Sequence, residues 1–172
     1  AITGLGNKGN RQAVEPLIAL VKNSQESEEL RAAAIEALAT IGDLRAINAI
    51  GIALRTATDF ISLLRRSAVK ALGLLPDVQS AKILVHSLRN DDVVVQSTAV
   101  ASLTAIGQAA ILPLIQGLET KGVESFVRQA QLESLEKITG QKLGTDPAKW
   151  HQWLEQNAQE ETARRQRQKT AG

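Results

Sequence analysis

Side chains that could perform acid–base or metal chemistry are few in this sequence and stand far apart. Its 172 residues include two histidines, His86 and His151, and no cysteine. A histidine that binds a metal or moves a proton works with further ligands or an orienting partner, and no second histidine or cysteine accompanies either one. We interpret His86 as a partly exposed helix residue. We predict no catalytic residue, no metal site and no cofactor, and the missing cysteines exclude thiol chemistry and disulfides.

Acidic residues gather where turns meet the starts of predicted helices. One group is Glu26, Glu28 and Glu29, and the other is Asp91 and Asp92. Carboxylates at such places accept hydrogen bonds from free backbone amides and favour the positive end of the helix dipole. We therefore predict a structural role for both groups.

Three arginines recur at equivalent positions, Arg31, Arg65 and Arg128, and Gln96 occupies the fourth. A guanidinium at such a position could bond an acidic or carbonyl group in a turn of its own or an adjoining unit, which is structural. It could instead recognise an anion or a partner, because its planar fork suits both tasks. Acidic residues shortly precede each arginine (Glu26, Asp59 and Glu124), and the missing arginine at Gln96 weakens a continuous basic track.

These arginines belong to a repeated segment. Leu30–Asp43 recurs as Leu64–Asp77, Val95–Gln108 and Val127–Gly140, and the break residues Gly6, Gly42, Pro76, Gly107 and Thr139 are 36, 34, 31 and 32 residues apart. Each copy carries an apolar stripe with helical spacing, and a second apolar helix follows each of the first three. A period in this range is typical of stacked helix pairs, each burying its apolar face against the next.

The repeat resembles the short HEAT-like repeat, including the subclass found in phycobilisome lyase proteins. The similarity covers residues 1 to about 140 and lies in Leu30-Arg31-x-x-Ala34-x-x-Ala37-Leu38-x-x-Ile41-Gly42-Asp43 and in partner helices with Ala-x-x-Pro-Leu-Ile patterns. It implies an all-α fold, a right-handed α-solenoid of antiparallel helix pairs. The sequence departs from the pattern at Pro76, Gln96 and Gln131, where we expect looser stacking.

Composition excludes several classes of function. The net charge of +2 is unlike that of a strongly basic nucleic-acid-binding protein. No apolar run approaches the roughly 18 residues that cross a bilayer, so direct membrane insertion is not indicated.

A solenoid of this kind binds partners on the concave face formed by its second helices, and we expect another protein or protein complex there. Leu74, Ala101 and Ala105 form a weakly apolar centre with charged residues around it, which suits protein binding. Alternatively, the small residues only relieve crowding. The predicted partner-binding residues are Arg66, Lys70, Leu74, Ala101, Ala105, Glu133 and Lys137.

After the last repeat the pattern changes to Gly144-x-Asp146-Pro147-x-x-Trp150-x-x-Trp153, which resembles the closing segment of bacterial HEAT-like proteins. Asp146 suits an N-cap and Pro147 a first helical residue, and the two tryptophans share one helix face. We predict a capping helix, although a ligand-stacking role stays open. The chain is thus divided into a repeat array (1–141) and a cap with a polar tail (142–172).

Residues 1–7 align with the last turns of a repeat helix, which suggests a fragment whose earlier repeats, and any targeting or membrane segment, lie outside it. We expect a cytoplasmic, non-enzymatic scaffold or adaptor that grips a protein on its concave face. The alternative is a subunit of a phycobilin lyase or isomerase, or a phycobiliprotein chaperone, that presents a tetrapyrrole or a phycobiliprotein.

Overall fold

The computed structural model describes residues 10–57 and 62–170. Its helices are η2 (Arg11–Ala13), α1 (Val14–Lys22), α2 (Glu28–Ile41), α3 (Ala46–Thr56), α4 (Leu63–Gly73), α5 (Val78–Ser87), α6 (Val93–Ile106), α7 (Gln108–Glu119), α8 (Ser125–Thr139) and α9 (Pro147–Thr170). No strand occurs in these two ranges, and the predicted all-α solenoid is confirmed. The helix end expected over residues 1–7 lies outside the described residues.

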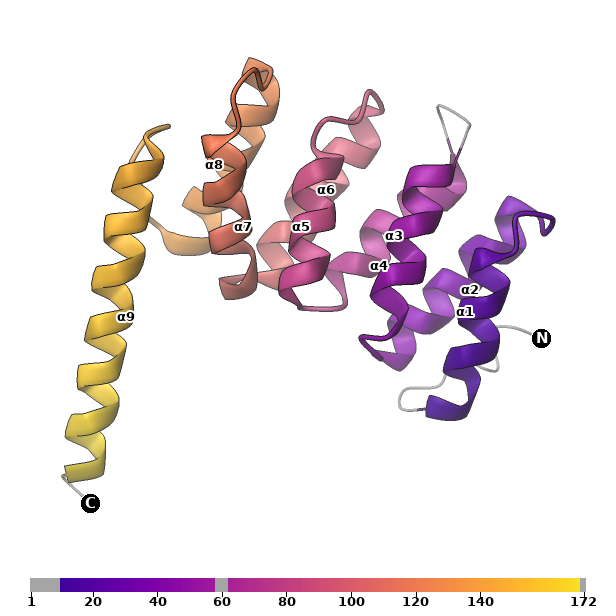
Figure 1. The fold of residues 1–172 in the computed structure, drawn as a ribbon, viewed down its shortest axis with the longest axis horizontal. Helices are drawn as coiled ribbons and strands as arrows, with labels where there is room; N and C mark the ends of the chain where they lie inside the picture. Colours follow the sequence, from indigo (N-terminus) through magenta and orange to yellow (C-terminus); the bar gives the residue numbers. More distant parts are fainter. Residues whose placement is uncertain (1–9, 58–61, 171–172) are drawn as a thin grey trace.

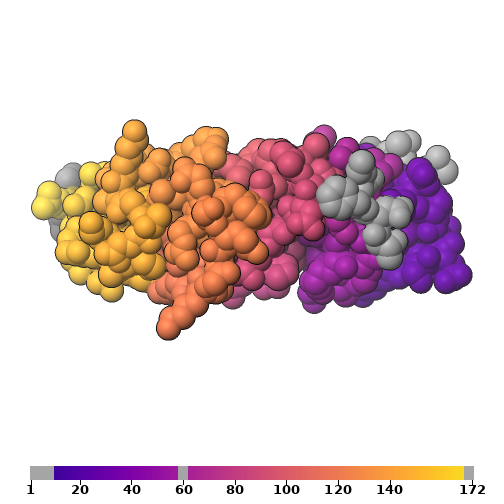
Figure 2. Space-filling model, turned by 90° about the horizontal axis from the view of Figure 1, so that it is seen from above, coloured from indigo at the N-terminus to yellow at the C-terminus, as the bar shows by residue number. Residues whose placement is uncertain are grey.

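The helices form two layers. Figure 1 shows α1, α3, α5 and α7 as one row in front of α2, α4, α6 and α8, and each helix packs against the next one in its own row. Figure 2 shows the colours following one another along the length of the molecule, so each repeat meets only its neighbours in the chain. We call the outer surfaces of the two rows the odd-helix face and the even-helix face.

Helices α2, α4 and α6 begin at side chains that cap their first amides. Ser27 Oγ accepts the Leu30 N–H at 3.2 Å, Ser62 Oγ accepts the Arg65 N–H at 3.2 Å, and Asp92 Oδ1 accepts the Val94 N–H at 2.8 Å. These bonds satisfy donors that a helix cannot pair internally. The structural role predicted for Asp92 is therefore confirmed.

Glycine ends α2, α6 and α8, and Pro76 replaces it after α4. Gly42 and Gly140 adopt left-handed φ values of 78° and 73°, which favour glycine. At the equivalent place after α4 the Leu75 N–H donates to the Leu72 carbonyl at 3.1 Å, which closes the turn before Pro76. Leu75 is completely buried, so the core is closed at this turn.

The core is the set of apolar stripes read from the repeats. Ile35, Leu38, Val69, Leu72 and Leu103 are completely buried. The small residues beside the stripe, Ala34, Ala68 and Ala99, are also completely buried, which is where helices of neighbouring repeats meet. The last copy is less covered, because Leu132 and Ile138 are only partly buried.

Gln131 takes the place of a packing alanine without opening the stack. It is 2% exposed, and a Cβ built on Gly117 of the neighbouring α7 would lie only 2.5 Å from its Nε2. The side chain that Gly117 lacks thus leaves space for the Gln131 amide. The longer side chain at residue 131 is thus matched by a glycine on the neighbouring helix.

Helix α9 lies at the C-terminal end, packs against α7 and extends beyond the stack (Figure 1). Trp150 is completely buried and donates its indole Nε1–H to the Gly144 carbonyl at 2.7 Å. Trp153 is half-buried and meets the Trp150 ring edge to face, with ring centroids 6.3 Å apart. Beyond Leu154 the helix is polar.

Candidate functional site: two faces of the solenoid

Most of the predicted partner-binding residues lie on the even-helix face and point to solvent. Lys70, Ala101, Ala105, Glu133 and Lys137 are exposed. The most exposed of the apolar members is Leu74, at 59% of its surface. An exposed leucine of this degree is compatible with a contact site, but exposed single leucines are also common on protein surfaces.

Five of these residues line two different hollows. Lys70 and Leu74 line a shallow hollow of about 230 Å³ between α2 and α4. Ala101, Glu133 and Lys137 line a second hollow of about 400 Å³ between α6 and α8. In the second hollow, Lys137 Nζ bonds Glu133 Oε1 at 2.6 Å. Arg66 and Ala105 line neither hollow, and the partner-binding assignment stays a prediction.

Arg66 is engaged within the fold. Its Nε and guanidinium NH2 donate to Asp92 Oδ2 at 3.1 and 3.0 Å, and the Asp92 side chain is only 5% exposed. Burial pushes the pKa of Asp92 up, but bonds from the Val94 amide and Arg66 outweigh it, so the pKa lies below its usual value. Arg66 is thus tied to the cap of α6.

The recurring arginines have a structural role. Arg31 Nε donates to the Val21 carbonyl at 2.9 Å, Arg65 to Ala57 O at 2.6 Å and Arg128 to Leu118 O at 3.1 Å. Gln96 Nε2 makes the equivalent bond to Leu88 O at 2.9 Å. Each side chain donates a hydrogen bond to a carbonyl at the end of the preceding odd helix. The structural role considered for the arginines is therefore confirmed. Gln96 makes the same kind of bond in its own repeat. Asp59, expected near Arg65, lies outside the described residues.

The C-terminal residues adopt the geometry expected of a helix start. Asp146 Oδ1 accepts the Ala148 N–H at 3.0 Å, and Pro147 is the first residue of α9. His151 Nε2 lies 2.9 Å from Glu119 Oε1 of α7, which links α9 to the stack. The assignment of Asp146, Pro147, Trp150 and Trp153 as a cap, and the boundary at residue 141, remain predictions.

Two surface features were not predicted from the sequence. One is a row of exposed apolar residues at the N-terminal ends of even helices: Leu63, Val93, Val94 and Phe126, which are 46–72% exposed. Leu63, Val94 and Phe126 each come directly before a buried residue, so the sequence signal was an apolar residue just outside the stripe.

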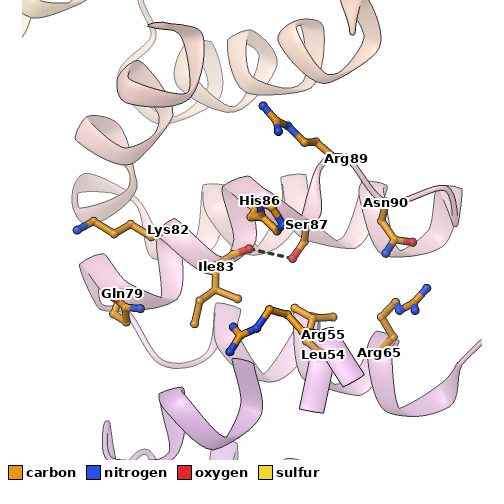
Figure 3. A pocket seen from close by; sticks show the side chains of 10 residues that line it. All are labelled: Leu54, Arg55, Arg65, Gln79, Lys82, Ile83, His86, Ser87, Arg89 and Asn90. Carbon is orange, nitrogen blue, oxygen red and sulfur yellow. Dashed lines mark hydrogen bonds between the residues drawn. The ribbon is translucent and has the colours of Figure 1, made fainter. Parts of the chain in front are cut away.

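The other is a groove on the odd-helix face. A hollow of about 690 Å³ lies between α3 and α5, and Figure 3 shows the side chains around it. A second hollow, of about 320 Å³, lies between α5 and α7. His86 lines both hollows and is exposed, as expected from the sequence.

Among residues 10–57 and 62–170, no three histidine, cysteine or acidic side chains come together in a way that could hold a metal ion. In the same residues, no helix is both long and apolar enough to span a bilayer.

Comparison with known proteins gives the family. A model of HEAT repeats matches residues 1–62 and 56–136. The chain belongs to the HEAT-repeat family. The alpha subunit of phycocyanobilin lyase from Picosynechococcus sp. is 36% identical over 92 residues, which are 51% of this chain and 34% of that protein. The chain therefore spans about a third of the length of this curated relative.

A solved structure also shows similarity to a phycocyanin lyase. The complex of CpcE and CpcF of phycocyanin lyase from Nostoc sp. matches with a TM-score of 0.54 and 25% identity, over 77% of this chain and 55% of that chain. The resemblance to phycobilisome-lyase-type HEAT repeats is thus confirmed. The prediction of a non-enzymatic role is wrong, because both relatives belong to lyases. The sequence misled because this chain offers no evident acid, base or nucleophile.

Proposed function

We propose that this HEAT-repeat chain is part of a phycobilin lyase subunit that acts together with a protein partner. The observation that carries the proposal is the similarity to a phycocyanobilin lyase alpha subunit, supported by the fold shared with a lyase that is a complex of two proteins. A generic scaffold explains the solenoid equally well but gives no reason for this similarity.

Within this proposal the solenoid binds and positions, since binding faces are what a stack of helix pairs supplies. The partner contacts the even-helix face through the two hollows, one with Lys70 and Leu74 and one with Ala101, Glu133 and Lys137. Shallow hollows with apolar floors and charged rims suit a protein partner.

Co-expression of the protein with a candidate partner subunit, a phycobiliprotein and its bilin tests the lyase role. We expect a bilin that stays attached to the phycobiliprotein after denaturation, detected by absorbance, and no such product when the HEAT-repeat protein is omitted. A partner that copurifies without any bilin attachment would overturn the lyase role.

The face is tested separately. Ala101→Arg and Ala105→Glu place charges on exposed positions of the even-helix face, so helicity and melting temperature should change little. Capture of the partner subunit should weaken by roughly tenfold or more. Asn48→Arg, which places a charge on an exposed position of α3, serves as a matched control on the odd-helix face. Unchanged capture by both even-face variants would move the site elsewhere.

A further inference from the structure

The odd-helix face carries a groove that the repeats do not need for their own stability. Helices α3 and α5 approach closely near Gly51, where a Cβ would lie 2.8 Å from Ile83 Cδ1. Beside this contact lies a hollow whose lining includes Leu54 of α3 and Ile83 of α5. A ligand in this hollow would meet apolar side chains from both helices.

The rim of this groove is basic. Arg55, Lys82 and Arg89 line the hollow with Arg65 and His86, and no carboxylate of the described residues lines it or the neighbouring hollow between α5 and α7. Figure 3 shows Arg55 on the α3 side, with Lys82 on α5 and Arg89 just after it.

The three cations of this rim have no carboxylate partner among the described residues. Arg45, Arg66 and Lys137 each bond a carboxylate within 3.0 Å, whereas no ion pair within the described residues involves Arg55, Lys82 or Arg89. Like charges that share a groove without counter-charges repel one another and produce a positive potential, which attracts an acidic partner.

The distribution of the charge indicates the shape of that partner. Lys82, His86 and Arg89 line both hollows, so they form a ridge along α5 with a depression on either side. A small anion in one hollow would use only part of this surface. An extended segment that crosses α5 would meet the basic ridge and fill both depressions.

We propose that the odd-helix face, from Arg55 across Lys82 to Arg89, docks an acidic segment of a partner protein that also carries apolar side chains. Carboxylates of the segment pair with the three cations, and its apolar side chains pack against Leu54 and Ile83. This site lies on the opposite face from the even-helix hollows and does not depend on lyase activity.

The test measures binding of a fluorescein-labelled peptide of glutamate and leucine to the whole protein by fluorescence anisotropy. We expect saturable binding that weakens with added salt, and no binding of a peptide with lysine in place of glutamate. Failure of the glutamate peptide to bind would overturn the proposal.

Charge reversal locates the site. The triple variant Arg55→Glu, Lys82→Glu, Arg89→Glu should weaken peptide binding by roughly tenfold or more. Its matched control is Lys22→Glu, Lys121→Glu, Lys149→Glu, which changes the net charge equally at exposed lysines elsewhere and should bind nearly as the unmodified protein does. An equal loss in both variants would reveal a general charge effect and contradict the proposal.

A milder variant and a competitor ligand complete the test. If the triple glutamate variant shows lower helicity by circular dichroism, a triple variant with glutamine at the same three positions is measured instead. The control then also carries glutamine at its three lysine positions. Biliverdin, a tetrapyrrole dicarboxylate, is added as a competitor. Displacement of the peptide by biliverdin, with biliverdin binding lost in the triple variant, would assign the groove to a small molecule and overturn the proposal.

Discussion

At the scale of single residues, the hydrogen bonds from the even helices to the ends of the odd helices define a structural rule. The side chain contributes one donor to a carbonyl that the helix cannot pair, and either arginine or glutamine can supply it. The charge of the arginine is therefore not what the position requires.

This rule predicts the effects of substitutions at Arg31, which is 8% exposed. Arg31→Ala removes the donor to Val21 O and should lower the free energy of unfolding by about 2 kcal/mol. Arg31→Gln should cost less than about 1 kcal/mol, because Gln96 makes the same bond in its own repeat. Urea unfolding curves of the two variants measure both values, and equal losses would show that the guanidinium charge matters.

The pair formed by Asp43 and Arg45 makes the stability of the protein depend on pH. Hydrogen bonds from the Arg45 side chain and amide lower the pKa of Asp43 from 3.8 to about 2. Because the folded state has the lower pKa, this pair stabilises the protein above pH 3.8, and the stabilisation is lost as the pH falls toward 2.

Asp43→Asn should therefore lower the melting temperature at pH 6. The difference in melting temperature between the variant and the unmodified protein should shrink as the pH falls from 4 toward 2. Thermal melts over this pH series measure the effect. Arg45 also bonds Glu15 at 2.8 Å, so Glu15→Gln serves as a control that leaves the Asp43 contact in place. A difference between the Asp43→Asn and unmodified proteins that stays constant with pH would contradict the assignment.

At the scale of helices, glycines set how closely neighbouring elements approach. A Cβ on Gly73 at the end of α4 would lie 2.6 Å from Ser102 Cβ and 2.9 Å from Ser102 Cα. On Gly117 the clash would be with the end of the flexible Gln131 side chain, which can turn away.

We accordingly expect Gly73→Ala to lower the free energy of unfolding by about 1–3 kcal/mol, since α4 and α6 would have to separate. Gly117→Ala should cost less, because Gln131 can move and alanine favours helix by about 1 kcal/mol. Adding Ser102→Gly to Gly73→Ala should recover part of the loss. Chemical denaturation compares these variants, and a larger cost at Gly117 would mean that Gln131 is held rigidly.

At the scale of the whole molecule, the sequence predicted the two-layer stack well because its apolar stripes repeat at a helical period and neighbouring repeats must bury them. The spacing of the apolar stripe predicted a buried face, and Leu38 and its equivalents are completely buried. The basic groove was not predicted, because packing brings its lining residues together from α3, α4 and α5, which belong to different repeats. The Arg66–Asp92 pair was missed for a similar reason, since it joins consecutive repeats through packing.

The linear arrangement of the repeats allows us to predict where unfolding begins. Each repeat meets only its neighbours, so loss of an end repeat leaves the other end intact. We expect the C-terminal end to depend on α9, in which Trp150 is completely buried and Trp153 is half-buried. The large cost expected for a buried tryptophan therefore belongs to Trp150.

Trp150→Ala should lower the free energy of unfolding by about 3–5 kcal/mol, and Trp153→Ala, its matched control on the same helix, by clearly less. The physical reason is the loss of packing against α7 and of the indole bond to the Gly144 carbonyl at 2.7 Å. Hydrogen exchange should rise first in α7, α8 and α9, while α1 to α4 keep their protection. A uniform rise along the chain would show that the stack unfolds as one unit and that α9 does not cap it.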